Sequence, residues 1–251
     1  MGTDLAGYGE YEIDIEDTLR QGLPGAFAQI GPAPLTADHV AAIPRGTKGA
    51  YLLFFDGRMV YAGKTDTRHG FRDRLGRHAD SVRHRVGLDP NKITFKAMRI
   101  MVFSAFDVEA ILISEMRRID RGALRWNDSG FGSNDPGRNR DLGKPADFDR
   151  EYPIDIDVEL AGLPEGPVIV TNLLKAAKEA VPYLLRYDVG ADAGQAQVIL
   201  PDGPRTMRAC LDAIASGLPD SFQITVFDGR IILYPLLRHY EFAREVISGR
   251  A

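Results

Sequence analysis

The sequence predicts an α+β protein, with a small antiparallel sheet flanked by helices and a second small α+β unit at the C-terminus. Two apolar runs around an Asp-Gly pair in GAYLLFFDGRMVYAG (49–63) predict a β-hairpin. Apolar residues at helical spacing predict helices over 70–86 and 108–119, and alternating basic and apolar residues predict a strand over 92–105. We expect these elements to form one domain over residues 49–150.

The segments on either side of this domain have different patterns. Residues 1–48 contain turn residues at 22–25 and 31–34, which predict an irregular or partly helical lead-in. Residues 155–251 predict the second unit, which begins with a helix N-capped by Thr171 and continues with a strand and a second helix. We expect it to end with an Asp-Gly hairpin in FQITVFDGRIILYP and a closing helix.

The charge of the chain is unevenly distributed. The net charge is −4, yet residues 58–140 carry 17 Lys and Arg against 10 Asp and Glu, while residues 1–57 and 151–251 are acidic. A basic middle segment is what contact with phosphate groups requires. Solvated charged helix faces would give the same count, so the charge alone does not identify a nucleic-acid partner.

Composition argues against several classes of protein. The single cysteine, Cys210, rules out an internal disulfide and a zinc site built on several thiolates. No apolar run approaches the roughly 18 residues of a membrane span, and the acidic N-terminal residues do not resemble a secretory signal. We therefore expect a cytoplasmic protein without a membrane partner.

The predicted elements carry side chains that phosphodiester hydrolysis can use. That reaction needs a base for water, a cation for the extra phosphate charge and a carboxylate for a metal. Arg74 and His78 are four residues apart and therefore share one face of a helix. Each candidate also has an ordinary explanation, such as core packing, a solvated surface, a helix dipole or a turn. The candidates are Tyr51, Tyr61, Lys64, Arg74, His78, Glu109 and Asn127.

The two carboxylates of the helix at 108–119 cannot both face one site. Glu109 and Glu115 are six residues apart, so they point about 120° apart on a helical wheel. Only one of them can readily face the site, and we expect the other to lie on the surface.

The order of these residues resembles a known family. Gly49-Ala50-Tyr51, nine residues and then Tyr61-Ala62-Gly63 resemble the paired tripeptides that name the GIY-YIG endonucleases, except for the middle residue of each. The resemblance continues through FRDRLGRH, DVEAIL and Trp126-Asn127. The following loop, GFGSNDPGRNRD, resembles the branch of stand-alone restriction enzymes that cut CCGCGG. The segment between the predicted helix at 108–119 and Asn127 is several residues longer than the family pattern. The chain after about residue 150 has no family counterpart.

The resemblance implies a Mg²⁺-dependent DNA endonuclease, with Mn²⁺ as a substitute metal, and a role for each candidate residue. Glu109 would face the site and bind the metal, which leaves Glu115 on the surface. Arg74 would offset charge on the phosphate. We favour Tyr51 as the base and Tyr61 as its partner, helped by His78 or Lys64. Asn127 would position groups at the site, while Arg138 and Arg140 would contact DNA.

The implied partners are double-stranded DNA, a second copy of the chain in a homodimer that reads a palindrome, and a methyltransferase acting on the same DNA site. Two alternatives remain open from the sequence. One is a repair or homing nuclease of the same fold, and the other is a non-enzymatic DNA-binding protein that kept the fold.

The turn of the hairpin decides whether the two tyrosines can share a site. A two-residue turn at Asp56-Gly57 in a regular hairpin would place Tyr51 and Tyr61 on opposite faces of the sheet. A three-residue loop would place them directly opposite each other on one face. We expect the three-residue loop, with a positive φ and a bulge at Gly57.

Overall fold

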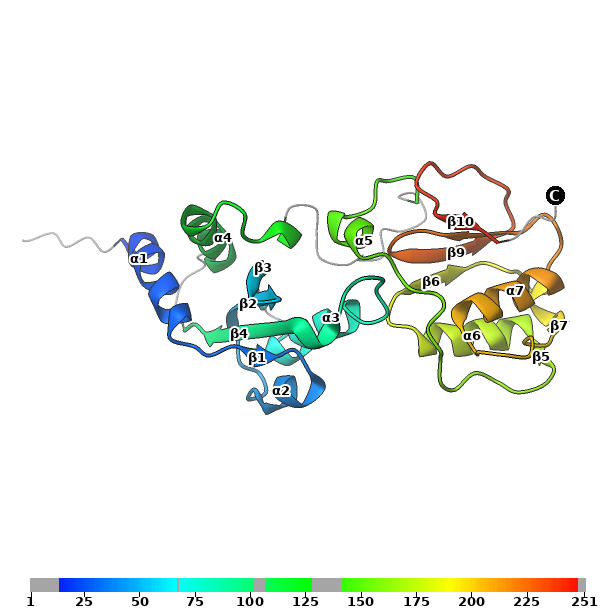
Figure 1. Cartoon of the computed structure of the whole chain (residues 1–251), viewed down its shortest axis with the longest axis horizontal. Coiled ribbons are helices and arrows are strands. Elements are labelled where there is room, and N and C mark those ends of the chain that lie inside the picture. Colours follow the sequence, from blue (N-terminus) through cyan, green and yellow to red (C-terminus); the bar gives the residue numbers. More distant parts are fainter. Residues whose placement is uncertain (1–13, 67, 102–106, 128–140, 248–251) are drawn as a thin grey trace, which may run out of the picture.

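The computed structural model describes residues 14–66, 68–101, 107–127 and 141–247. These residues form two units that lie side by side along the long axis of the molecule (Figure 1). Each unit is built on a four-stranded sheet. Helices and mainly antiparallel strands occur in both, so the predicted α+β class is confirmed.

The N-terminal sheet is centred on the predicted hairpin. β2 (Gly49–Phe55) pairs with β3 (Arg58–Lys64) on one side and with β4 (Ile93–Arg99) on the other, and β1 (Ala33–Pro34) pairs with β4. The order is β1-β4-β2-β3, so β3 is an edge strand. The central position of β2 explains its unbroken apolar sequence, because both of its faces are covered.

Helices cover both faces of this sheet. α1 (Ile15–Ala28) and α4 (Val108–Ile119) pack on the face that contains Leu52. The other face contains Tyr51 and packs against α2 (Ala37–Ala42) and α3 (Phe71–Ser81). The expected lead-in therefore supplies two helices and an edge strand to the same unit that holds the hairpin.

Glu115 lies between α1 and α4, which contradicts the expectation of a surface position. It is 7% exposed and forms ion pairs with Arg20 of α1 at 3.2 Å and with Arg118 at 2.9 Å. The hydrogen bond from Arg118 is the main reason why its pKa is lowered. Glu115 therefore joins two helices and has a partner for its charge.

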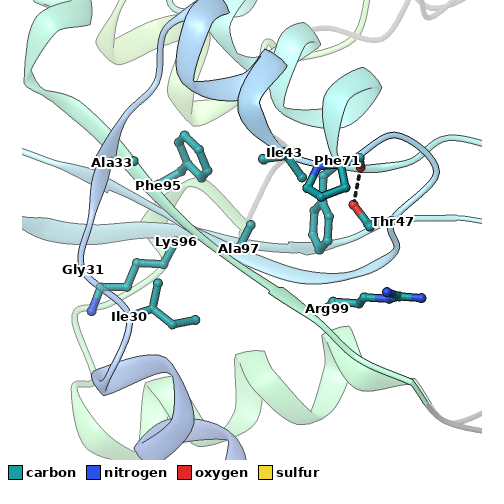
Figure 2. Close-up of a pocket in the computed structure, with 11 residues that line it drawn as sticks. Ile30, Gly31, Ala33, Ile43, Thr47, Phe71, Phe95, Lys96, Ala97 and Arg99 are labelled. Atoms are coloured by element: carbon teal, nitrogen blue, oxygen red, sulfur yellow. Dashed lines mark hydrogen bonds between the residues drawn. The ribbon is translucent and has the colours of Figure 1, made fainter.

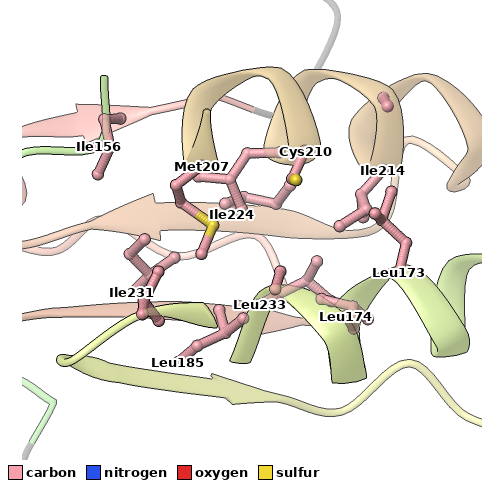
Figure 3. Packing of buried hydrophobic residues seen from close by; sticks show 14 of the residues in the cluster. Ile156, Leu173, Leu174, Leu185, Met207, Cys210, Ile214, Ile224, Ile231 and Leu233 are labelled. Atoms are coloured by element: carbon pink, nitrogen blue, oxygen red, sulfur yellow. The ribbon is translucent and has the colours of Figure 1, made fainter. Parts of the chain in front are cut away.

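The C-terminal unit packs two helices on one face of a mixed sheet. α6 (Val170–Ala180) and α7 (Met207–Gly217) bury Leu173, Leu174, Cys210 and Ile214 against the strands (Figure 3). The sheet order is β10-β8-β9-β6, with β6 parallel to β9. The bounds are β6 Leu184–Tyr187, β8 Gln223–Val226, β9 Arg230–Tyr234 and β10 Glu245–Val246, and a separate pair consists of β5 Val168–Ile169 and β7 Gln197–Val198.

Two details of this unit differ from the expectation. Thr171 lies inside α6, whose N-cap is Ile169, and its hydroxyl donates a hydrogen bond to the carbonyl of Gly194 at 2.9 Å. The expected closing helix is absent from residues 235–247, which form loops and the short strand β10. Within the described ranges, no helix is both long and apolar enough to cross a membrane.

The two cores separate between Tyr152 and Ile154. Tyr152, together with Phe148 of α5 (Asp147–Glu151), belongs to the N-terminal core, whereas Ile154 belongs to the C-terminal one. Backbone hydrogen bonds join the units, such as the one from the amide of Asp155 to the carbonyl of His84 at 2.9 Å. The next residue, Arg85, forms an ion pair with Asp149 of α5 at 2.8 Å within the N-terminal unit, with both side chains at most 3% exposed. In Figure 1, α5 lies at this junction.

Candidate active site at the edge of β3

The hairpin has a two-residue turn, so the expected three-residue loop is wrong. Asp56 and Gly57 have φ angles of 50° and 76°, and Phe55 pairs directly with Arg58. The register then shifts between the pairs Phe54–Met59 and Leu53–Tyr61, because Val60 is an extra residue in β3. The positive φ at Gly57 is confirmed, and the predicted bulge exists but lies at Val60.

The bulge brings the two tyrosines to one face. Val60 and Tyr61 follow each other in sequence, yet both pack against the core that contains Tyr51. Tyr51 pairs with Gly63 rather than with Tyr61, and the two tyrosine rings lie diagonally, with centroids 6.1 Å apart. The shared face is therefore confirmed, although the direct pairing is not.

Gly63 makes room for this arrangement. A Cβ atom at this position would lie 2.6 Å from both Cζ and Oη of Tyr51 and 2.8 Å from a ring carbon of Tyr61. Both distances are shorter than real Cβ contacts. The glycine of the Tyr61-Ala62-Gly63 tripeptide thus allows the Tyr51 ring to cross β3.

His78 meets Tyr51 from α3. Its Nε2 lies 2.8 Å from the Tyr51 hydroxyl, and the ring packs on the same stripe as Leu75. Burial, followed by the charge of Arg74, lowers the pKa of His78 to about 3, so the imidazole is neutral at pH 7. Burial also raises the pKa of the Tyr51 hydroxyl, and the neighbouring Tyr61 adds to this effect.

Arg74 lies one helical turn before His78 and is half-buried. Its charge opposes the upward pKa shifts of Tyr51 and Tyr61, and it forms a hydrogen bond with Tyr51. Among the described residues, its buried Nε has no hydrogen-bond partner. A buried donor without a partner is costly, so this arginine is arranged to receive an acceptor such as a phosphate oxygen.

Glu109 approaches the same strand from the other face of the sheet. It lies in the first turn of α4 and is half-buried. Burial raises its pKa and Asp107 adds to that shift, whereas the charges of Lys64 and Arg74 act in the opposite direction. The positive charge of Arg74 therefore lowers the pKa of both tyrosines and of Glu109.

Lys64, at the end of β3, pairs with Asp107 at 2.7 Å. Asp107 is also the N-cap of α4, where its carboxylate accepts from the backbone of Ala110. Asp107 is not among the residues that the sequence predicts for the site. The ion pair depends on the end of β3 meeting the start of α4, for which the sequence has no local signal.

Asn127 touches the backbone of the edge strand instead of the reacting groups. Its Oδ1 accepts from the amide of Ala62 and its Nδ2 donates to the carbonyl of the same residue, both at 2.8 Å. The Asn127 side chain therefore makes the two backbone hydrogen bonds that a neighbouring strand would make to Ala62, the residue between Tyr61 and Gly63. Asn127 is a positioning residue in this structure.

The donor set fits a metal that keeps most of its water. Among the described residues, no group of three or more His, Cys, Asp or Glu could hold a metal ion. A half-buried Glu109 with a raised pKa would gain from a nearby divalent cation. Mg²⁺ binds through one or two carboxylates and retains several waters. Arg138 and Arg140 lie outside the described residues.

The site lies beside edge strand β3 and is distinct from the pocket shown in Figure 2. That pocket, of about 390 Å³, lies beside β4 and is lined by Phe71, Phe95 and Ala97, with Arg99 at one end. Phe71 separates it from Tyr51, since the two rings pack edge to face at 6.4 Å.

Comparison of the chain with protein-family models and with curated protein sequences gives no match.

Proposed function

We propose that this protein is a metal-dependent DNA endonuclease of the GIY-YIG type, and specifically a restriction endonuclease. The observation that carries the proposal is the convergence of five side chains on edge strand β3. They come from two strands and two helices, and include a cation with an unused buried donor and a half-buried carboxylate. The five are Tyr51, Tyr61, Arg74, His78 and Glu109.

Glu109 would hold Mg²⁺, or Mn²⁺ in its place. When bound, the ion would supply Lewis-acid stabilisation of negative charge on the scissile phosphate. Arg74 would donate to a nonbridging phosphate oxygen through its free Nε and stabilise the charge that develops there. Donors of this kind contribute roughly 10²–10³ in rate.

Exposure favours Tyr61 as the tyrosine that meets the attacking water. Tyr51 is 0% exposed and hydrogen-bonded to His78, whereas Tyr61 is only half-buried. Tyr61, as a phenolate, would take a proton from water, while Tyr51, held by neutral His78, would donate a hydrogen bond to the Tyr61 oxygen. Tyr61 would later release that proton to solvent. The hydroxide attacks phosphorus, the bond to the leaving oxygen breaks, and that oxygen takes a proton from solvent. The hydrogen bond between the two tyrosines supports this path.

Double-stranded DNA is the proposed substrate, because the basic excess of the chain lies in residues 58–140, which include every candidate except Tyr51. A palindromic target would present the same surface twice, so we propose a homodimer. A methyltransferase that modifies the same DNA site would protect the host DNA.

Plasmid cleavage with and without Mg²⁺ tests the proposal, using Glu109→Gln and Glu115→Gln as a matched pair. Both glutamates belong to α4, but Glu115 lies away from β3 and forms ion pairs with Arg20 and Arg118. We expect discrete fragments from the wild-type protein with Mg²⁺, no cleavage by Glu109→Gln and full cleavage by Glu115→Gln at a temperature where it is folded.

The alternatives give other results. Binding without cleavage under any metal would identify a DNA-binding protein that kept the fold. Cleavage without discrete fragments would favour a repair or homing nuclease. Full activity of Glu109→Gln would remove the metal assignment.

A further inference from the structure

A second pocket lies against edge strand β3, beside the turn of the hairpin. It has a volume of about 590 Å³ and is bounded by the turn residue Asp56, by Arg58 and Met59 of β3, and by Gly122 and Arg125. Its lining is mainly polar, unlike that of the apolar pocket in Figure 2. Two arginines in the wall of a polar pocket are suited to hold an anion.

The chain that follows α4 builds one wall of this pocket. It returns along β3, where the amide of Leu124 donates to the carbonyl of Met59 at 3.2 Å, and Asn127 holds the backbone of the same strand through its two hydrogen bonds. This is the segment that is several residues longer than the family pattern. The additional residues therefore have a defined place, because they hold Gly122 and Arg125 beside the hairpin.

Arg125 is held in one orientation by two residues at the end of α5. Its Nη1 pairs with Glu151 at 2.9 Å, and its Nη2 donates to the hydroxyl of Tyr152 at 2.9 Å. That hydroxyl donates to Glu151 at 3.0 Å, which closes the triangle of contacts. The charge of Arg125 is thus balanced by Glu151, but its side chain remains 45% exposed, so a ligand can still reach it.

Arg58 supplies the positive charge of the pocket that is not balanced. It is the first residue of β3 and is exposed. Within the part of the chain that the structure describes, Arg58 forms no ion pair, whereas Asp56 lies 4.0 Å from Lys92. An excess of positive charge attracts anions, and the planar guanidinium matches the oxygens of a phosphate group.

Strand β3 connects this pocket with the candidate active site. Arg58 pairs with Phe55, and Tyr61 pairs with Leu53, two residues away on β2. A strand rises about 3.3 Å per residue, so Arg58 and Tyr61 lie about 7 Å apart along the sheet edge. One strand of DNA advances about 3.4 Å per nucleotide, so this separation corresponds to about two nucleotides.

We infer that the pocket beside Arg58 binds a phosphate of the DNA backbone, about two nucleotides from the phosphate that is cleaved. This inference rests on the proposed function. Arg58 donates to the phosphate oxygens, and Arg125 forms the opposite side of the pocket. A phosphate contact carries no information about the base, so the pocket fixes the position of the DNA strand along β3 and not its sequence.

A salt titration of DNA affinity tests this inference with Arg58→Ala and Lys175→Ala in the full-length protein. Each variant loses one exposed positive charge, but Lys175 belongs to α6 of the C-terminal unit. We expect Arg58→Ala to weaken binding about tenfold and to reduce the slope of log K against log salt by about one. It should keep the wild-type single-turnover rate at saturating DNA, because Arg58 does not touch the reacting groups.

Lys175→Ala should keep both the affinity and the slope of the wild type. Equal slopes in the wild type and the two variants would overturn the inference.

A second pair of variants makes the opposite change of charge. Glu151→Gln removes the charge that balances Arg125 and keeps an oxygen that can accept its hydrogen bond, while Glu179→Gln makes the same change on the exposed side of α6. We expect Glu151→Gln to bind DNA more tightly than the wild type and with a steeper dependence on salt. An affinity no greater than that of Glu179→Gln would overturn the pocket.

Neutral methylphosphonates placed singly in a duplex test the position of the contact. The wild type should lose affinity when the phosphate about two nucleotides from the cut is replaced, whereas Arg58→Ala should lose none there. Equal losses in both proteins at every position would overturn the inference and leave the proposed function standing. Absence of DNA binding by the wild type would overturn the proposed function itself.

Discussion

The molecule contains two hairpins with the same four residues at the turn, Phe-Asp-Gly-Arg, at 55–58 and 227–230. In the first, Asp56 and Gly57 both have positive φ and a bulge follows at Val60. In the second, the amide of Phe227 donates to the carbonyl of Arg230 at 2.8 Å, and the register from Val226–Ile231 to Gln223–Tyr234 is constant. Identical turn sequences therefore occur in one hairpin with a bulge and in one without.

The difference between the hairpins follows from what their strands contact. The regular hairpin alternates strictly, and Ile224, Val226, Ile231 and Leu233 all enter one core. Its turn lies at the unit junction, where the Asp228 carbonyl accepts from the amide of Ile154 at 2.7 Å. The bulged hairpin breaks the alternation, which allows a two-residue turn and a shared face for two tyrosines. Packing, and not the turn sequence, decides the register.

Gly63→Ala should have the largest effect, because it changes the feature that the second hairpin lacks. The added Cβ would overlap Tyr51, and overpacking of this kind costs about 1–3 kcal/mol. We expect cleavage to fall by about 10² or more, since the Tyr51 ring must move away from His78. Single-turnover cleavage and urea unfolding measure the two effects.

Gly76→Ala in α3 is the control for this substitution, because its Cβ would meet nothing within 4 Å. Alanine is a better helix former than glycine, so the control should gain up to about 1 kcal/mol of stability and retain cleavage. Similar losses of stability and cleavage in the two variants would show that the tyrosines do not require a glycine at position 63.

Deletion of Val60 would convert the first hairpin into the regular form of the second. Leu53 would still pair with Tyr61, so the tyrosines would keep a common face, but the core would lose the buried Val60 side chain. We expect a loss of about 1–3 kcal/mol in the free energy of unfolding and cleavage within about tenfold of the wild type. Complete loss of cleavage in a folded variant would mean that the bulge itself shapes the site.

A pH titration of stability distinguishes the tyrosine face from the apolar interior of the second hairpin. The folded pKa of His78 is about 3 and its ordinary value is 6.5, so the unfolded chain binds the proton more tightly. The stabilisation due to neutral His78 is present above pH 6.5 and is lost as the pH falls toward 3. From pH 7 to pH 5 the wild type should lose about 2 kcal/mol through this residue.

His78→Gln removes this titration and keeps a side chain that can hydrogen-bond to Tyr51. Its free energy of unfolding should therefore fall less steeply between pH 7 and pH 5, by about the same 2 kcal/mol. Parallel curves for the two proteins would mean that His78 is not buried in its neutral form.

Gly57→Ala should have the smallest effect. A Cβ at this position would meet nothing within 4 Å, so only the positive φ of 76° opposes it, at a cost of about 1–2 kcal/mol. Gly22→Ala inside α1 also meets nothing within 4 Å and should be neutral or stabilising. Thermal unfolding compares the two variants, and equal changes of the unfolding midpoint Tm would argue against the two-residue turn.

Local patterns predicted the elements that carry the site, but several contacts depend on distant parts of the chain. Alternation and helical spacing predicted the hairpin, α3, β4 and α4. Two of these elements carry Tyr51, Arg74 and His78, which contact one another in the structure. The position of the bulge depends on how Val60 and Tyr61 fill the core. The burial of Glu115 depends on Arg20 of a helix that had no clear pattern, since Pro24 lies inside α1.

The path of the chain between the two units has a consequence for its synthesis. Phe148 and Tyr152 complete the core beneath the hairpin, whereas the partners of Asp141 extend to Tyr234, about 80 residues later. At roughly 5–20 residues per second, the ribosome needs about 4 to 16 s to make that interval. The nascent N-terminal unit can therefore fold around its tyrosines several seconds before Tyr234 is made and can donate a hydrogen bond to the Asp141 carboxylate.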